Sequence, residues 1–109
     1  MSLLDTTILR NVEPGTYFTC ISSFEEVNIE GRQPYIQVEM SIDDLLVTDR
    51  WYSNRIPYIM NCLRHQFEMD YMDCTLSGLL EKCRKQDFIV TVSYDPKYGR
   101  QIGYREEVI

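Results

Sequence analysis

Residues 35–42 alternate apolar and polar side chains without interruption, and this pattern constrains the fold more than any other part of the sequence. Successive side chains of a strand point to opposite faces, so a period of two indicates a strand with one buried face. The apolar face of this predicted strand consists of Ile36, Val38, Met40 and Ile42. The residues between them face solvent or a ligand.

Four further segments have the composition and flanking turns of strands. They are rich in β-branched and aromatic residues, and Pro, Gly, Asn or Asp stand near their ends. These predicted strands are residues 16–24, 45–52, 88–94 and 100–105. A polar loop around Gly31 makes a hairpin of the first two strands in the chain, and the turn at 95–99 makes a hairpin of the last two.

Two helices are predicted between the third and fourth strands. Ser53 and Asn54 can cap the first helix, Pro57 suits an early helical turn, and apolar residues recur at helical spacing as far as Phe67. Thr75 is the predicted N-cap of a shorter helix that ends near three basic residues.

This order of elements predicts a mainly β fold with a helical insertion. Three strands, a helical connection and two strands are the plan of the OB-fold, a five-stranded Greek-key barrel with its helices between strands 3 and 4. The alternative is an α+β open sheet with the helices on one face. We expect one OB-like domain over residues 12–105, preceded by a loosely ordered segment, 1–11, and followed by a short tail, 106–109.

Charge is unevenly distributed along the 109 residues, whose formal net charge is −6. Residues 1–49 contain two basic and nine acidic residues, whereas residues 50–109 contain nine basic and eight acidic residues. The total charge does not favour phosphate binding, so any nucleic-acid surface must be local. The apolar runs are too short for a membrane span, so we expect a soluble protein that does not bind membranes. The scattered cysteines, with no signal peptide before them, are typical of the reducing cytoplasm, which is the expected location.

The cysteine and histidine residues do not form a recognisable chemical motif. The four cysteines lie at least nine positions apart, and the single histidine, His65, cannot complete a conventional zinc set with them. A nucleophile pair of Cys62 or Cys83 with His65 is the weaker alternative to buried, unreactive thiols. Because phosphate-loop and nucleophile-elbow motifs are also absent from the sequence, we expect no enzyme, no metal and no cofactor.

Several segments together resemble the small single-stranded-DNA-binding proteins of phages and mobile elements. The resemblance is carried by Pro14-Gly15-Thr16-Tyr17, the Gly31 hairpin with the strand after it, Arg50-Trp51, and the segment from Tyr94 to Arg100. It covers about residues 12–105 and implies an OB-fold, non-catalytic binding of single strands in DNA replication or recombination, and homo-oligomers, dimers above all. The sequence ends Arg105-Glu106-Glu107-Val108-Ile109 and lacks the long acidic tail of bacterial single-strand binders, which puts recruitment of partners by such a tail in doubt.

Single-strand binding requires basic side chains along the phosphates and aromatic rings on which bases stack. The candidates combine both kinds of residue and lie in the first hairpin, at the end of the third strand and at the last turn. The predicted nucleic-acid-binding residues are Arg32, Tyr35, Gln37, Arg50, Trp51, Tyr52, Arg55, Lys97, Tyr98 and Arg100. Trp51 could instead anchor the core, and the arginines could instead neutralise the acidic first half.

A second hypothesis is an acidic protein–protein interaction module with an OB-like barrel and no nucleic-acid binding. The net charge favours this alternative. The two hypotheses differ in where charge is placed. If the basic candidates converge on one concave face, single-stranded DNA or RNA is the expected partner, whereas interleaved acids favour a protein partner.

Overall fold

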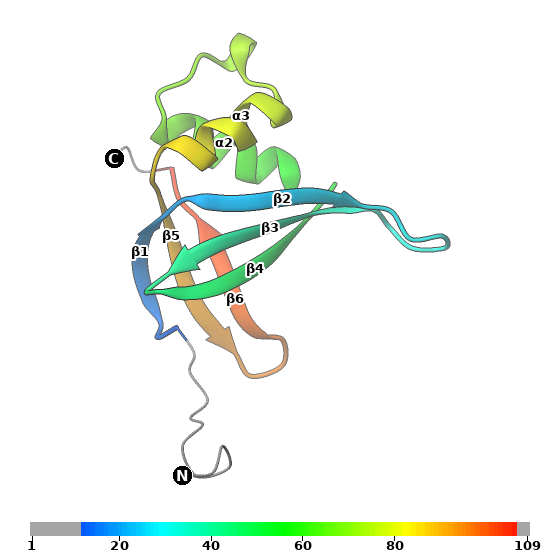
Figure 1. Ribbon diagram of the computed structural model, residues 1–109, viewed down its shortest axis with the longest axis vertical. Helices are drawn as coiled ribbons and strands as arrows, with labels where there is room; N and C mark the ends of the chain where they lie inside the picture. The colour runs from blue at the N-terminus through cyan, green and yellow to red at the C-terminus, as the bar shows by residue number, and fades with distance from the viewer. Residues whose placement is uncertain (1–11, 107–109) are drawn as a thin grey trace.

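The computed structural model describes residues 12–106 and contains two three-stranded antiparallel sheets (Figure 1). The order of strands is β1–β5–β6 in one sheet and β2–β3–β4 in the other. The strands are β1 (Gly15–Thr19), β2 (Ile21–Val27), β3 (Tyr35–Ile42), β4 (Leu45–Tyr52), β5 (Phe88–Asp95) and β6 (Gly99–Tyr104).

The predicted five-stranded barrel is wrong. The predicted first strand is interrupted at Cys20: β1 pairs with β5 in one sheet, whereas β2 pairs with β3 in the other. A register shift between Ile21 and Ser23 accompanies this change of sheet, as expected of a β-bulge, which bends a strand. Among the described residues, no ladder joins β4 to β6, so the two sheets do not close, and the helices follow the fourth strand rather than the third.

The strand prediction is confirmed closely where alternation is strongest. β3 and β4 have the predicted bounds, 35–42 and 45–52, and are joined at Asp43 and Asp44, whose φ angles are 54° and 64°. Val38, Met40 and Ile42 are fully buried, and Ile36 is half-buried. The predicted face of this strand therefore does point into the core.

Both predicted helices are present and lie together at one end of the structure (Figure 1). They are α2 (Ile56–Gln66) and α3 (Leu76–Lys85), with a short 3₁₀ turn, η1 (Tyr71–Asp73), between them. The Thr75 hydroxyl accepts a hydrogen bond from the Gly78 N–H at 3.1 Å, as predicted for an N-cap. Arg55, not Ser53 or Asn54, occupies the N-cap of α2.

The core joins both sheets to both helices in one cluster of buried side chains. Gln66 is its principal polar member: its amide N–H groups donate to the carbonyls of Ile89 (3.0 Å) and Arg105 (2.7 Å), and its oxygen accepts from the Ile89 N–H (2.7 Å). Because both the nitrogen and the oxygen of this amide are hydrogen-bonded, its burial costs little free energy. It holds the end of α2 against β5 and the end of β6.

The four cysteines are free; Cys62 and Cys83 are buried, whereas Cys20 and Cys74 are half-buried. Burial raises the pKa of the Cys83 thiol to about 12, which keeps this thiol protonated at neutral pH. Within residues 12–106, no helix has the length and apolar character needed to cross a bilayer.

A candidate nucleic-acid interface between β4 and β6

A groove of about 620 Å³ lies where an edge of one sheet faces an edge of the other. We call it the β4–β6 groove. It contains three arginines, two tyrosines and one carboxylate. Its lining residues are Thr48, Asp49, Arg50, Tyr52, Arg55, Tyr98, Arg100, Gln101 and Ile102.

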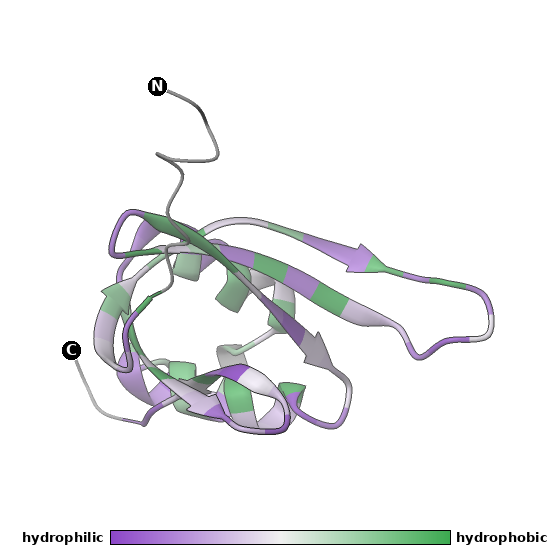
Figure 2. Ribbon diagram, turned by 90° about the horizontal axis from the view of Figure 1, so that it is seen from below, coloured by the Kyte–Doolittle hydropathy of each residue, from purple (hydrophilic) through white to green (hydrophobic). Residues whose placement is uncertain are grey.

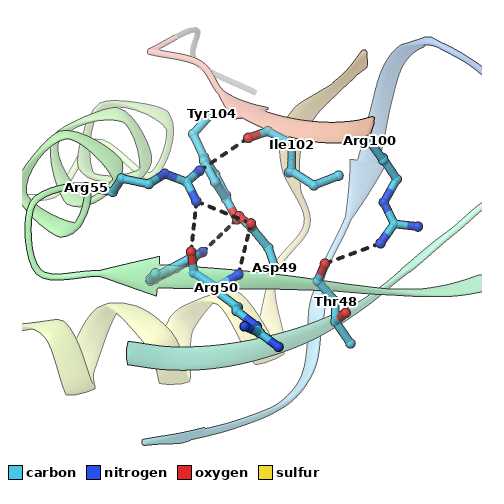
Figure 3. A network of polar contacts seen from close by, with 8 residues as sticks. Thr48, Asp49, Arg50, Arg55, Arg100, Ile102 and Tyr104 are labelled. Atoms are coloured by element: carbon cyan, nitrogen blue, oxygen red, sulfur yellow. Dashed lines mark hydrogen bonds and ion pairs between the residues drawn. The ribbon is translucent and has the colours of Figure 1, made fainter. Parts of the chain in front are cut away.

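A chain of hydrogen bonds beneath the groove links the two sheets (Figure 3). The Trp51 indole N–H donates to the Tyr104 hydroxyl at 2.8 Å, and this hydroxyl donates to Asp49 Oδ2 at 2.8 Å. Both rings are buried, and burial together with the Asp49 charge raises the pKa of Tyr104 well above 10. This network ties β4 to β6 through side chains.

Arg55 holds the same carboxylate from the other side (Figure 3). Its Nη1 lies 3.3 Å from Asp49 Oδ1 and donates to the Arg50 carbonyl at 2.8 Å, while Nη2 donates to the Ile102 carbonyl at 3.4 Å. The side chain of Asp49 is 13% exposed and that of Arg55 is 39% exposed. The one acid of the groove is therefore already paired, and its guanidinium partner still reaches solvent.

The turn between β5 and β6 supplies the opposite wall. Asp95 Oδ1 accepts hydrogen bonds from the backbone N–H groups of Lys97 (2.7 Å) and Tyr98 (3.0 Å), and Gly99 has a φ of 77°, which suits glycine. These contacts define the turn and leave the Tyr98 ring 71% exposed. Beyond it, Arg100 Nη2 donates to the Thr48 carbonyl of β4 at 3.4 Å, as Figure 3 shows.

An aromatic cluster adjoins the groove on the outer face of β3 and β4. The Tyr35 and Tyr52 rings lie 5.2 Å apart between centroids, and Arg50 Cζ lies 4.8 Å from the Tyr35 centroid. A hydrogen bond to Tyr52, followed by attraction to Tyr35, raises the pKa of Arg50 above its ordinary value. A cation–π contact at this distance attracts the guanidinium to the ring, and Arg50 remains exposed.

The structure brings together half of the predicted site residues. Five of them line the β4–β6 groove: Arg50, Tyr52, Arg55, Tyr98 and Arg100. Tyr35 adjoins it through Arg50, and Lys97 lies beside it in the turn, with Nζ 5.1 Å from the Tyr98 centroid.

The remaining three candidates lie elsewhere. Trp51 is 0% exposed and bonded to Tyr104, so it presents no ring face on which a base could stack. Gln37 sits in a separate hollow beside Glu25 and Glu39, and Arg32 lies in the loop between β2 and β3.

Asp49 and Tyr104 are not among the residues predicted from the sequence, and the structure joins them by a hydrogen bond at the groove. A signal for Asp49 was present, because it shares the inward-facing parity of Val47 and Trp51 along β4, and an acid on a buried face requires a polar partner. The sequence around Asp49 does not identify Tyr104 as that partner, because Tyr104 lies 55 residues further along the chain.

No protein-family model, curated protein or solved structure matches this chain. In the part of the chain that the structure describes, no three His, Cys, Asp or Glu side chains are grouped so that they could hold a metal ion. The groove can therefore be interpreted only from its own chemistry, which is that of a cationic, aromatic surface.

Proposed function

We propose that this protein binds single-stranded DNA, without catalysis and largely without regard to sequence, in the β4–β6 groove. The observation that carries the proposal is the convergence of Arg50, Arg55 and Arg100 with two tyrosines in one groove. Arg50 lies on β4 and Arg55 at the start of α2, whereas Arg100 lies on β6, 50 positions after Arg50. Only one carboxylate, Asp49, accompanies them, and Arg55 pairs with it.

The arginines provide the electrostatic part of the proposed binding. Arg50 and Arg100 are exposed, and neither forms an ion pair with a described residue. A local cationic surface attracts phosphates and releases their counterions even when the net charge of the protein is negative. The total of −6 thus does not conflict with binding at this groove.

The tyrosines provide the part of binding that is not electrostatic. Tyr98 is 71% exposed on one wall, and the Tyr35–Tyr52 pair lies on the other. Stacking of a base on an exposed aromatic ring contributes about 1 to 3 kcal/mol and tolerates any base. Bases displayed in this way are available only in a single strand, so duplex DNA should bind more weakly.

Fluorescence anisotropy of labelled oligothymidylate, titrated with the protein at several salt concentrations, tests this proposal. We expect binding that weakens steeply with salt and exceeds the binding of a duplex of the same length. The double change Arg50→Ala and Arg100→Ala should weaken binding about tenfold or more and reduce the salt dependence. An oligouridylate of equal length, titrated in parallel, distinguishes a preference for DNA from one for RNA.

Arg84→Ala combined with Lys85→Ala is the matched control, since it removes two positive charges from the end of α3, outside the groove. Equal losses in the two double variants would show general attraction to charge and overturn the groove as the site. Absence of binding at every salt concentration would overturn the function and favour a protein-interaction module. The homodimer implied by the family resemblance remains a prediction, which sedimentation velocity at the titration concentrations tests.

A further inference from the structure

A second hollow, of about 370 Å³, lies between β2 and α3. Its apolar lining comes from Phe24 on β2, Ile36 on β3, and Leu76 and Leu80 on α3. A smaller hollow of about 150 Å³ shares Ile36 and Leu76 and continues toward Ile56. Together they form a trough, which we call the β2–α3 trough.

The trough lies on the face of the β2–β3–β4 sheet that packs against the core. It occupies the end of this face that the rest of the chain does not cover. Phe24 pairs in register with Val38, and Val38 is fully buried, whereas Phe24, Ile36 and Leu76 are only half-buried. Figures 1 and 2 show the reason: the β2–β3 hairpin projects beyond the rest of the fold, and the helices cover only its base. Apolar surface that the chain does not cover marks an interaction site when it is contiguous.

The backbone beside the trough is also available for pairing. β2 is at the edge of its sheet, and within the described residues it pairs with β3 alone. An edge strand beside an apolar groove beneath a helix is the arrangement that accepts an extended peptide as an additional strand. Main-chain hydrogen bonds then give affinity, and alternate side chains of the peptide enter the groove.

The charges at the trough specify the kind of peptide. Glu25 and Glu26 are exposed members of its lining, and neither hollow has a Lys or Arg among its lining residues. Glu26 Oε2 accepts a hydrogen bond from the Asn28 side chain at 2.8 Å, which leaves its charge unneutralised. A segment that enters here should therefore carry positive charge beside its apolar residues.

We propose that the β2–α3 trough binds an extended segment of a partner protein that alternates aliphatic residues with Lys or Arg. The segment adds to the free edge of β2 and places its aliphatic side chains against Phe24, Ile36 and Leu76. Its basic side chains then lie on the opposite face of the sheet, beside Glu25, while Glu26 adds negative charge on the trough face. None of the residues that contact the segment lines the β4–β6 groove, although Tyr35, which adjoins that groove, also lines the smaller hollow of the trough. The proposal therefore goes beyond single-strand binding and does not depend on it.

The probe is a labelled synthetic peptide of about six residues that alternates valine or isoleucine with lysine, since this is the usual length of a strand. We expect saturable binding, and binding about tenfold weaker when glutamate replaces lysine or when serine replaces the aliphatic residues. Amide hydrogen exchange followed by NMR should show new protection at residues 24–27. Binding without that protection overturns strand addition, and no binding overturns the proposal.

The double change Glu25→Lys and Glu26→Lys should weaken peptide binding about tenfold or more. Glu13→Lys with Glu30→Lys is the control of equal charge change, because both residues are exposed and lie outside the trough. Equal effects of the two variants would overturn the site. Self-association that the first variant abolishes and the control preserves would replace the proposed partner with a second copy of this chain. Oligothymidylate binding, measured on the same samples, reports the β4–β6 groove separately.

Discussion

Trp51 on β4 donates a hydrogen bond to the hydroxyl of Tyr104 on β6, and their rings meet edge to face with centroids 5.5 Å apart. Since no backbone ladder joins these two strands among the described residues, this side-chain contact is one of those that hold the two sheets together. The Tyr104 hydroxyl also donates a hydrogen bond to Asp49, which lines the β4–β6 groove (Figure 3). Stability and binding should therefore both depend on this pair.

Replacement of Tyr104 by Phe should lower the free energy of unfolding by about 1 to 3 kcal/mol, because Trp51 Nε1 and Asp49 Oδ2 each lose a hydrogen-bond partner in a buried place. Urea unfolding followed by tryptophan fluorescence measures this change. Tyr71→Phe is the control, since Tyr71 is 74% exposed. A loss no greater than that of the control would contradict a structural role for the network.

The same network predicts the response to alkaline pH. The pKa of Tyr104 is raised by burial first and by Asp49 second, so the folded protein keeps its proton after the unfolded chain has begun to lose it, near pH 10. The stabilising contribution is complete below pH 10 and should then fall by up to about 1.4 kcal/mol per pH unit until the folded state also ionises. Unfolding curves between pH 8 and about pH 11 should show this slope in the wild type and a smaller slope in Tyr104→Phe.

Stacking at the groove predicts a specific effect of Tyr98. Tyr98→Ala should weaken oligothymidylate binding by about 1 to 3 kcal/mol and leave the salt dependence unchanged, because a neutral ring is removed. Tyr98→Phe should bind nearly as well as the wild type. Tyr71→Ala, at an equally exposed tyrosine outside the groove, should have no effect, and a similar loss at both positions would argue against a defined stacking site.

The turn between β3 and β4 offers a prediction about stability alone. Asp43 and Asp44 both have positive φ, a conformation that costs non-glycine residues energy. Asp44→Gly should raise the free energy of unfolding by about 0.5 to 1 kcal/mol, since an aspartate followed by glycine suits a turn of this kind. Asp95→Gly should do the opposite, because Asp95 accepts two backbone hydrogen bonds in its own turn. Denaturant midpoints of the two variants measure both effects.

The sequence predicted the strands well where one face is buried and the other is not. Residues 35–42 and 45–52 have their expected bounds because alternation fixes both the element and the side that it buries. It failed at Cys20, where a β-prone stretch continues in composition while the chain passes from one sheet to the other. The alternation of apolar and polar residues does not change at that bend, and it carries no information on whether the two sheets close. Neither feature could therefore be predicted from it.

The candidate site was predictable in its residues but not in its assembly. Arg50, Tyr52 and Arg55 are close in sequence, and so are Tyr98 in the β5–β6 turn and Arg100 at the start of β6, so each group could be recognised by composition. The two groups lie in one groove because β4, at the edge of one sheet, faces β6, at the edge of the other. Trp51 shows the limit of composition most clearly, because its neighbours line the groove while its own side chain is in the core.

Two arginines of the groove have a consequence for solubility. Arg55 donates to the Ile102 carbonyl of β6, and Arg100 donates to the Thr48 carbonyl of β4. Unsatisfied strand edges are templates for pairing between molecules, and here one carbonyl of each edge accepts a hydrogen bond from a guanidinium on the other side of the groove. A variant that lacks both arginines exposes these carbonyls and should aggregate more readily through intermolecular strand pairing.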